Sequence, residues 1–160
     1  MESIVTIRRL APSDADSILA IQFRCLQLAQ WSKRDYQDLA DRGMVGWVAS
    51  LSSSASGNES NLHTPVIGFI TARVAADELE ILNLGVAPEE RRRGAASALL
   101  QAALAWAAKN HARRGFLEVR ESNLPAIQFY QRAGFQQAGR RSHYYSSPSE
   151  DALQLAVHIP

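Results

Sequence analysis

The chain has 160 residues, of which 46% are hydrophobic and 21% charged, so it can form one domain with a real core over residues 1–160. Its net charge of +1 lacks the basic excess of general nucleic-acid binders, and no apolar run is long enough to cross a bilayer. The start, MESIVTIRRL, lacks the basic and then apolar pattern of a secretory signal. The one cysteine, Cys25, excludes an internal disulfide and suits a reducing compartment. We therefore expect a cytoplasmic protein that binds neither nucleic acid nor membrane.

The first third of the chain combines one strand pattern with two helix patterns. Apolar and polar residues alternate at the start, which is the period of a half-buried strand. The segment APSDADSILAIQFRCLQLA then predicts a helix with Ser13 or Asp14 as N-cap and an apolar face that continues to Leu28. In order, we expect a strand over 3–10, a helix over 11–29, a helix from Ser32 to Gly43 and a strand over 44–51.

The rest of the chain alternates between strands and helices after one polar segment. Residues 52–65, SSSASGNESNLHTP, are Ser-rich and without periodicity, which predicts a flexible hairpin loop. Pro125 lies where a helix can start, and Gly134 is placed to end it as a C-terminal cap. We expect strands over 66–75 and 78–87, a helix over 92–110, a strand over 115–121, a helix over 125–134, and strands over 135–141 and 152–159.

This order of elements predicts a mixed α/β fold with seven strands and four helices. The helix over 92–110 lies between two strands, as in a parallel crossover unit, whereas the strands before it are joined by short turns and are expected to be antiparallel. A dinucleotide-binding Rossmann fold is not expected, because no G-x-G-x-x-G follows the first strand.

Three arginines stand where the helix after the strand ILNLGV should begin, in RRRGAASALL from Arg91. A helix N-terminus is already partly positive, so cations there repel one another unless an anion binds. Gly94 and the alanines after it leave the first amides uncovered, which suits a phosphate. The alternative is a solvated turn paired with Glu89 and Glu90.

The spacing Arg91-x-x-Gly94-x-Ala96 resembles the R/Q-x-x-G-x-G/A phosphate loop of the GNAT N-acetyltransferases. The resemblance implies acetyl-CoA as cosubstrate, with its pyrophosphate on the loop. It also implies the GNAT fold, in which the two central parallel strands splay apart in a V and the pantetheine lies between them. The cofactor-binding residues implied are Leu84, Gly85, Val86, Arg91, Arg92, Arg93, Gly94, Ala95, Ala96, Ser97 and Asn123.

Longer strings resemble the RimI-type protein N-terminal acetyltransferases within that superfamily. These are LNLGVAPEERRRGAASALL, FLEVRESNLPAIQFYQRAGF and YYSSPSEDALQL, and they cover Glu80 to Leu155 almost without interruption. The resemblance implies transfer of acetyl to the N-terminal alanine of a ribosomal small-subunit protein.

Glu118, in FLEVR, is the candidate general base. A carboxylate on a strand inside a sheet is costly unless it has a task or a partner, and burial would raise its pKa toward a useful range. The alternative is an ion pair with Arg120 on the same strand face. The RimI-like string favours catalysis, because the family's glutamate at this place accepts the proton. Glu80, on the neighbouring strand, is the rival base or a ligand for the acceptor's amino group.

Tyr130, in QFYQRAGF, is the candidate acid for the departing thiolate. Helical spacing alone favours a core aromatic beside Phe129, whereas the family's Y-x-x-x-G-F signature implies contact with the sulfur. Gly85 suggests a close backbone approach by the ligand or a bulge without one, and the neighbouring strand amides are expected to polarise the thioester carbonyl. Asn123 could be only a helix cap, and the resemblance makes it a CoA contact.

Tyr144 and Tyr145 belong to a loop that flanks the peptide entrance in RimI-like enzymes, so we expect them to hold the acceptor backbone. An aromatic-capped hairpin is the alternative. The four histidines have no metal-ligand spacing, and no metal is expected.

Other functions remain open at this point. An acetyltransferase for lysine side chains or a small amine is the second hypothesis, and a non-catalytic acyl-CoA-binding module is the third. An α-amine titrates near neutrality and needs only a modest base, which favours the first hypothesis. The sequence carries no prediction of oligomeric state.

Overall fold

The computed structural model describes residues 3–53 and 64–160, which fall into two compact units. The first unit comprises the described residues up to 73 together with residues 82–105, and the second comprises residues 74–81 and 106–160. The single domain expected over the whole chain stays a prediction, and most of the flexible loop expected at 52–65 lies outside the described residues.

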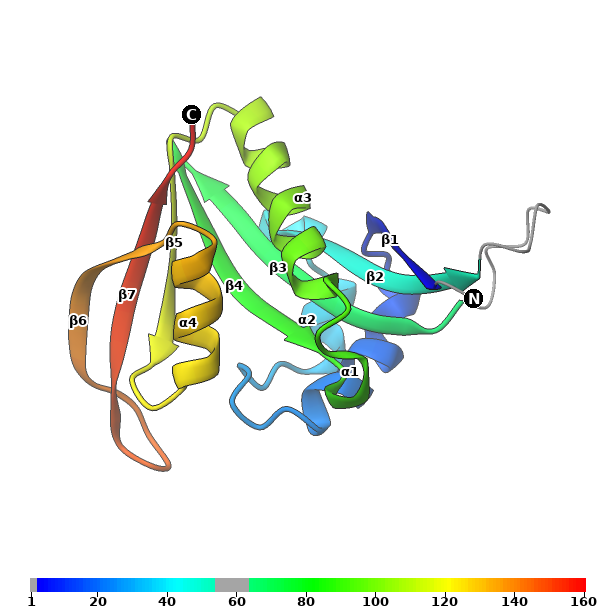
Figure 1. Ribbon diagram of the computed structural model, residues 1–160, viewed down its shortest axis with the longest axis horizontal. Helices are drawn as coiled ribbons and strands as arrows, with labels where there is room; N and C mark the ends of the chain where they lie inside the picture. The colour runs from blue at the N-terminus through cyan, green and yellow to red at the C-terminus, as the bar shows by residue number, and fades with distance from the viewer. Residues whose placement is uncertain (1–2, 54–63) are drawn as a thin grey trace. The chain divides into compact units, whose positions relative to one another are not determined.

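Three antiparallel strands come first in the sheet (Figure 1), close to the segments 3–10, 44–51 and 66–75 where strands were expected. Ile7 lies opposite Ala49 between the first two strands, and Trp47 lies opposite Ile70 between the next two. The strands are β1 (Ser3–Arg9), β2 (Val45–Ser53) and β3 (Val66–Ala75).

The helices of the first unit are shorter than expected. A 3-10 turn, η1 (Pro12–Asp14), precedes α1 (Ala15–Phe23), so the helix expected over 11–29 was wrong in its second half. The Arg24 amide bonds back to the Ile21 carbonyl, which ends the helix. Leu26 lies in the turn after the helix and is 81% exposed. The helical period of 3.6 residues no longer places it on the buried face.

The helix expected from Ser32 to Gly43 is divided in two. Ser32 caps α2 (Lys33–Gln37) and forms a capping box with Asp35, as its residue type favours. A second 3-10 turn, η2 (Ala40–Arg42), follows, and Gly43 ends it with a left-handed φ of 68°. The predicted start and end are therefore right, and the continuous helix between them is wrong.

A buried polar network lies among the core side chains of the first unit. The Tyr36 hydroxyl donates to Gln22 Oε1 at 2.5 Å and accepts from Asn83 Nδ2 at 3.2 Å. The Asn83 amide also donates to the Ala29 carbonyl, and Gln22 donates to the Trp31 carbonyl. Burial raises the pKa of Tyr36, which keeps it a neutral donor. These bonds anchor the segment between α1 and α2 to β4.

The second unit is built on an antiparallel trio in which β7 lies between β5 and β6 (Figure 1). The helix α4 connects β5 to β6. It ends at Gly134, whose φ of 96° confirms the predicted glycine cap. The elements are β4 (Glu78–Val86), whose first residues belong here, β5 (Arg114–Arg120), α4 (Leu124–Arg132), β6 (Gln136–Tyr145) and β7 (Glu150–His158).

The seven strands form one mixed sheet in the order β1-β2-β3-β4-β5-β7-β6, which confirms the expected fold class. β4 and β5 are parallel, and their pairing runs from Glu78–Arg114 to Glu80–Phe116. The crossover between them carries α3 (Ala95–Lys109), close to the predicted 92–110. Among the described helices, none is both long and apolar enough to cross a membrane.

Candidate functional site: an anion loop and a carboxylate cluster

The turn before α3, in the first unit, leaves backbone donors without acceptors. After a 3-10 turn, η3 (Pro88–Glu90), the chain takes left-handed φ values of 63° at Arg92 and 80° at Gly94. The first helical bond runs from the Ala98 amide to the Gly94 carbonyl at 3.0 Å. The amides of residues 95–97 therefore lack helical acceptors, and the described residues provide no other backbone acceptor for them.

The three arginines have different surroundings. Arg91 is turned inward, with Nε 3.4 Å from the Val86 carbonyl oxygen and a terminal nitrogen 3.4 Å from Sγ of buried Cys25. Arg93 pairs with Glu90 at 3.0 Å. Within the described parts of the chain, no ion pair is recorded for exposed Arg92.

The alternative of a turn neutralised by its own glutamates holds for Arg93 alone. Glu89 pairs instead with Arg24, at the end of α1, at 2.9 Å. The loop thus keeps an unneutralised guanidinium beside a helix N-terminus, which is the arrangement that an anion stabilises. Nothing lies within 4 Å of the position that a Gly94 Cβ would occupy, so the approach to the backbone is open. These features fit a phosphate group.

Gly85 lies on β4. Its surroundings give a reason for glycine other than the two expected from the sequence, a close approach by a ligand and a bulge. A Cβ there would lie 2.5 Å from Leu28 Cδ1 and 3.0 Å from Phe69 Cε1. Close packing of these apolar side chains therefore favours glycine, because a larger residue would displace Leu28 and press on Phe69. Roles for the backbone of Leu84, Gly85 and Val86 toward a ligand stay predictions.

Glu118, on β5 in the second unit, is ion-paired. Its Oε1 lies 2.6 Å from Nε of Arg141 on β6, and its side chain is only 15% exposed. The alternative raised from strand alternation, an ion pair with Arg120, is wrong. Arg120 pairs with Glu150 at 3.2 Å instead.

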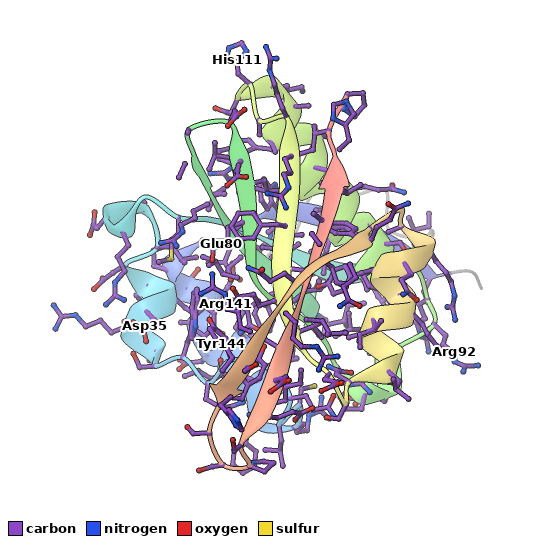
Figure 2. All side chains as sticks on the ribbon, turned by 90° about the vertical axis from the view of Figure 1, so that its left-hand side faces the viewer. Asp35, Glu80, Arg92, His111, Arg141 and Tyr144 are labelled. Atoms are coloured by element: carbon purple, nitrogen blue, oxygen red, sulfur yellow. The ribbon has the colours of Figure 1, made fainter. Side chains whose placement is uncertain are left out.

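Two further donors surround the Glu118 carboxylate. Gln154 Nε2, on β7, lies 3.4 Å from Oε1, and the Tyr144 hydroxyl also bonds to the carboxylate. The hydrogen bond to Glu118, then partial burial and the nearby negative charges, which include Glu80, raise the pKa of Tyr144. In Figure 2, Glu80, Arg141 and Tyr144 lie in one group beside β5. The structure thus brings Glu80, Glu118 and Tyr144 together, and their roles in catalysis or acceptor binding stay predictions.

The second tyrosine of the pair is fixed by a cation. The Arg120 guanidinium lies 4.3 Å from the Tyr145 ring centroid, and the ring packs edge-on against Tyr144 at 5.0 Å. Burial raises the pKa of Tyr145 to about 12. Glu150 holds this arrangement to the turn after β5, because it accepts from Arg120 and from the Ser122 amide at 2.6 Å.

Tyr130 lies on the buried face of α4. Its ring packs edge-on against Phe129 at 5.1 Å and Phe135 at 5.4 Å. Burial raises the pKa of Tyr130, so the phenol carries its proton at neutral pH. Among the described residues, no hydrogen bond of its hydroxyl is recorded. It is a core aromatic, and a role as proton donor stays a prediction.

Asn123 is the N-cap of α4, as its residue type suggested. Its Oδ1 accepts from the Ala126 amide at 3.3 Å, while contact with CoA stays a prediction. No group of three or more His, Cys, Asp or Glu side chains that could hold a metal occurs within residues 3–53 and 64–160.

The fold and these two clusters can be compared with known proteins. The profile of the acetyltransferase (GNAT) family matches residues 15–135. The chain belongs to the GNAT acetyltransferase family. Members of this family use acetyl-CoA, and Arabidopsis thaliana NAA60, crystallised in complex with acetyl-CoA, has the same fold. NAA60 has a TM-score of 0.81 and 24% identity, with 98% of this chain and 99% of NAA60 covered.

Two relatives carry names that specify an acceptor. A Bacillus subtilis protein, provisionally named a [ribosomal protein bS18]-alanine N-acetyltransferase, is 28% identical over 99% of both chains. The Escherichia coli [ribosomal protein bS18]-alanine N-acetyltransferase is 36% identical over 93 residues, which is 57% of this GNAT chain and 63% of the relative. These matches confirm the RimI-type resemblance.

Sequence reasoning did not identify Arg141, Gln154 or Gly139 as parts of the Glu118 surroundings. Strand alternation does place Gly139 and Arg141 on one face of β6. This alternation could not reveal the contact with Glu118. The contact depends on the pairing of β6 with β7, and that pairing shifts register between Gln137 and Gly139.

Proposed function

We propose that this GNAT acetyltransferase transfers acetyl from acetyl-CoA to the N-terminal α-amine of a protein. The acceptor class is an N-terminal alanine, as on a ribosomal small-subunit protein. The observation that carries the proposal is the Glu118 carboxylate, held by Arg141 beside the half-exposed ring of Tyr144. The names of the Bacillus subtilis and Escherichia coli relatives support the alanine acceptor.

The loop from Arg91 to Ser97 is the proposed diphosphate site. Its helix-end amides supply hydrogen-bond donors, and Arg92 supplies positive charge that no recorded side chain neutralises among the described residues. Acetyl-CoA, when bound, supplies the acetyl group as a thioester. Backbone N–H groups at residues 84–86 are proposed to polarise the thioester carbonyl.

Glu118 is proposed to take the proton of the acceptor's amine. The amine nitrogen forms its bond to the acetyl carbon and loses one proton, which passes to the Glu118 carboxylate. An α-amine is partly deprotonated near neutral pH, so a carboxylate suffices as base. Glu80, in the same group, is proposed to attract the ammonium form before the reaction.

Tyr130 is proposed to donate a proton to the sulfur of the leaving CoA thiolate. As the carbon–sulfur bond breaks, the sulfur takes the phenolic proton, so the products are the acetylated amine and the free thiol. Solvent then protonates Tyr130 and accepts the proton held by Glu118, which restores both groups. Tyr130 carries its proton at neutral pH, which a proton donor requires.

Mass spectrometry of acetylated peptides tests the proposal. A peptide that begins with alanine and lacks lysine is incubated with acetyl-CoA, beside the same peptide with a blocked N-terminus and a blocked peptide that contains lysine. We expect one added acetyl group on the free N-terminus and none on the other two. Glu118→Gln should lower the rate by about a hundredfold, the range of a lost general base.

Glu121→Gln is the matched control, because Glu121 also pairs with an arginine, Arg140, but is about half exposed. It should retain the wild-type rate. Acetylation of the lysine peptide alone would show a side-chain acceptor. Acetyl-CoA binding without transfer to any N-terminus would contradict the proposal, and equal rates for Glu118→Gln and wild type would transfer the role of base to Glu80.

A further inference from the structure

Three residues lie in one row across β6, β7 and β5 of the second unit. Gly139 is opposite Gln154 in the β6–β7 pairing, and Gln154 is opposite Glu118 in the β5–β7 pairing. Residues opposite one another in antiparallel strands share a face of the sheet, so their side chains are neighbours. Gln154 therefore lies between the candidate base and a residue without a side chain.

Gly139 leaves space that the Gln154 side chain uses. A Cβ on Gly139 would lie 2.5 Å from Gln154 Oε1, so the end of the glutamine side chain would have to move away, while the 3.5 Å to its Cδ is an ordinary contact. The φ of Gly139 is not left-handed, so conformational freedom does not require glycine here. The requirement is space for the glutamine amide.

The amide that crosses this space donates to the base. Gln154 Nε2 lies 3.4 Å from Oε1 of Glu118, and Arg141 Nε lies 2.6 Å from the same oxygen. A carboxylate oxygen has two lone pairs, so these donors occupy Oε1. The Tyr144 hydroxyl also bonds to the carboxylate, and Oε2 still retains a lone pair for the amine of an acceptor.

We propose that Gln154 is a positioning residue for Glu118, and that residue 139 is glycine so that Gln154 can reach it. The inference rests on the proposed function, in which Glu118 accepts the amine proton. Gln154 from β7 and Arg141 from β6 hold Oε1 from two strands, which turns Oε2 toward the acceptor. Without Gln154 the carboxylate rotates more freely, and the chemical step slows.

Gln154→Met is the first test, because methionine keeps the length of the side chain and removes the donor. We expect kcat on the alanine peptide to fall about tenfold, with an unchanged KM for acetyl-CoA and an unchanged Tm. Gln137→Met, on an exposed side chain of the same hairpin, is the matched control and should change none of the three. In a Glu118→Gln background, Gln154→Met should cause no further loss, since positioning acts only through Glu118.

Gly139→Ala tests the space itself. The added methyl group should displace Gln154, lower the Tm and reduce kcat as Gln154→Met does. In Gly139→Ala/Gln154→Asn, the shorter amide relieves the overlap but no longer reaches Glu118. We therefore expect the Tm to recover while kcat stays low.

The outcomes separate this inference from the function on which it rests. If wild type acetylates free N-termini in a Glu118-dependent way while Gln154→Met matches Gln137→Met, only the positioning role is overturned. Additive losses in the double variant, or recovery of kcat together with Tm in Gly139→Ala/Gln154→Asn, also overturn it. A wild type that transfers acetyl to no N-terminus, or whose rate does not depend on Glu118, overturns both.

Discussion

Arg141 Nε lies 2.6 Å from Oε1 of Glu118, so the candidate base is ion-paired before an acceptor binds. The two residues are on different strands, β6 and β5, with β7 between them. The guanidinium also lies 5.7 Å from the ring centroid of Tyr144. One cation thus organises both the base and an aromatic side chain expected to hold the acceptor, which makes Arg141 the first residue to vary.

Arg141→Gln should lower kcat/KM for the alanine peptide by about tenfold at neutral pH, because Glu118 Oε1 loses its charged donor. Arg140→Gln is the matched control: Arg140 pairs with Glu121 and Asp151, away from the base. Arg140 pairs with the more exposed carboxylates, so Arg140→Gln should barely change the Tm. Arg141→Gln leaves the 15% exposed Glu118 carboxylate without its cation, so its Tm should be somewhat lower. Equal loss of activity in both variants would contradict a specific role for Arg141.

Gly94→Ala should weaken acetyl-CoA binding by about tenfold, because the new methyl group enters the space through which a phosphate reaches the amides. The φ of 80° at this position also makes alanine unfavourable, so we expect a stability loss of about 1 kcal/mol. Gly43→Ala has the same cost, at a φ of 68° and with open space around it, but lies outside the anion loop. Calorimetric titration of both variants, beside thermal melts, should show weaker binding for Gly94→Ala alone.

Arg92→Gly should be at least as stable as wild type yet bind acetyl-CoA about fivefold more weakly. Arginine at a φ of 63° is strained by about 1 kcal/mol, and glycine relieves this strain. The greater freedom of glycine in the unfolded chain partly offsets the gain in stability. The salt dependence of the Kd should also become shallower as one cation is lost. Arg93→Gly is the comparison, because it removes the ion pair with Glu90 without relieving strain. A loss of stability in Arg92→Gly as large as in Arg93→Gly would argue against strain at Arg92.

Glu150→Gln should flatten the acid limb of the stability profile. The hydrogen bonds from Ser122 and then the Arg120 guanidinium lower the pKa of Glu150 below its ordinary value of 4.5. A lowered carboxyl pKa means that the unfolded chain binds the proton more readily. The stabilisation is therefore complete above about pH 4.5 and is lost as the pH falls through the folded-state pKa. Urea unfolding between pH 3 and 7, with Glu121→Gln as control, measures this difference, and parallel profiles for Glu150→Gln and wild type would refute it.

Local signals predicted much of the fold and the anion loop. The alternation that predicted the strand over 3–10, the helix start at Ser32 and the Gly134 helix end each depend on a few neighbouring residues, and each was confirmed. Gly94 was also predicted from its immediate context, and its left-handed φ is consistent with the uncovered amides beside it. The helix expected to continue past Phe23 was wrong, because apolar spacing alone does not reveal where a turn replaces it.

The surroundings of Glu118 could not be predicted in the same way. Glu118 itself was identified from FLEVR, but two of its donors, Gln154 and Arg141, come from strands whose register has an irregularity on each side of Arg141. A shift of one residue would turn the side chain of Arg141 to the other face of the sheet. Gly85 is a similar case, since its packing against Phe69 joins different strands.

The resemblance of the chain's motifs to a known family was thus enough to indicate an acetyl-CoA-dependent transferase of the GNAT type, and the roles of its anion loop and candidate base stay predictions. Caps, turns and periodicity act over a few residues, so they can be recognised without the fold. The partners of Glu118, the holding of Tyr145 by Arg120 and the space at Gly139 were decided by tertiary structure. They depend on strand register, because each contact joins residues at least 15 positions apart, the shortest being Gly139 to Gln154, and hydrogen bonding of the whole sheet selects the pairing.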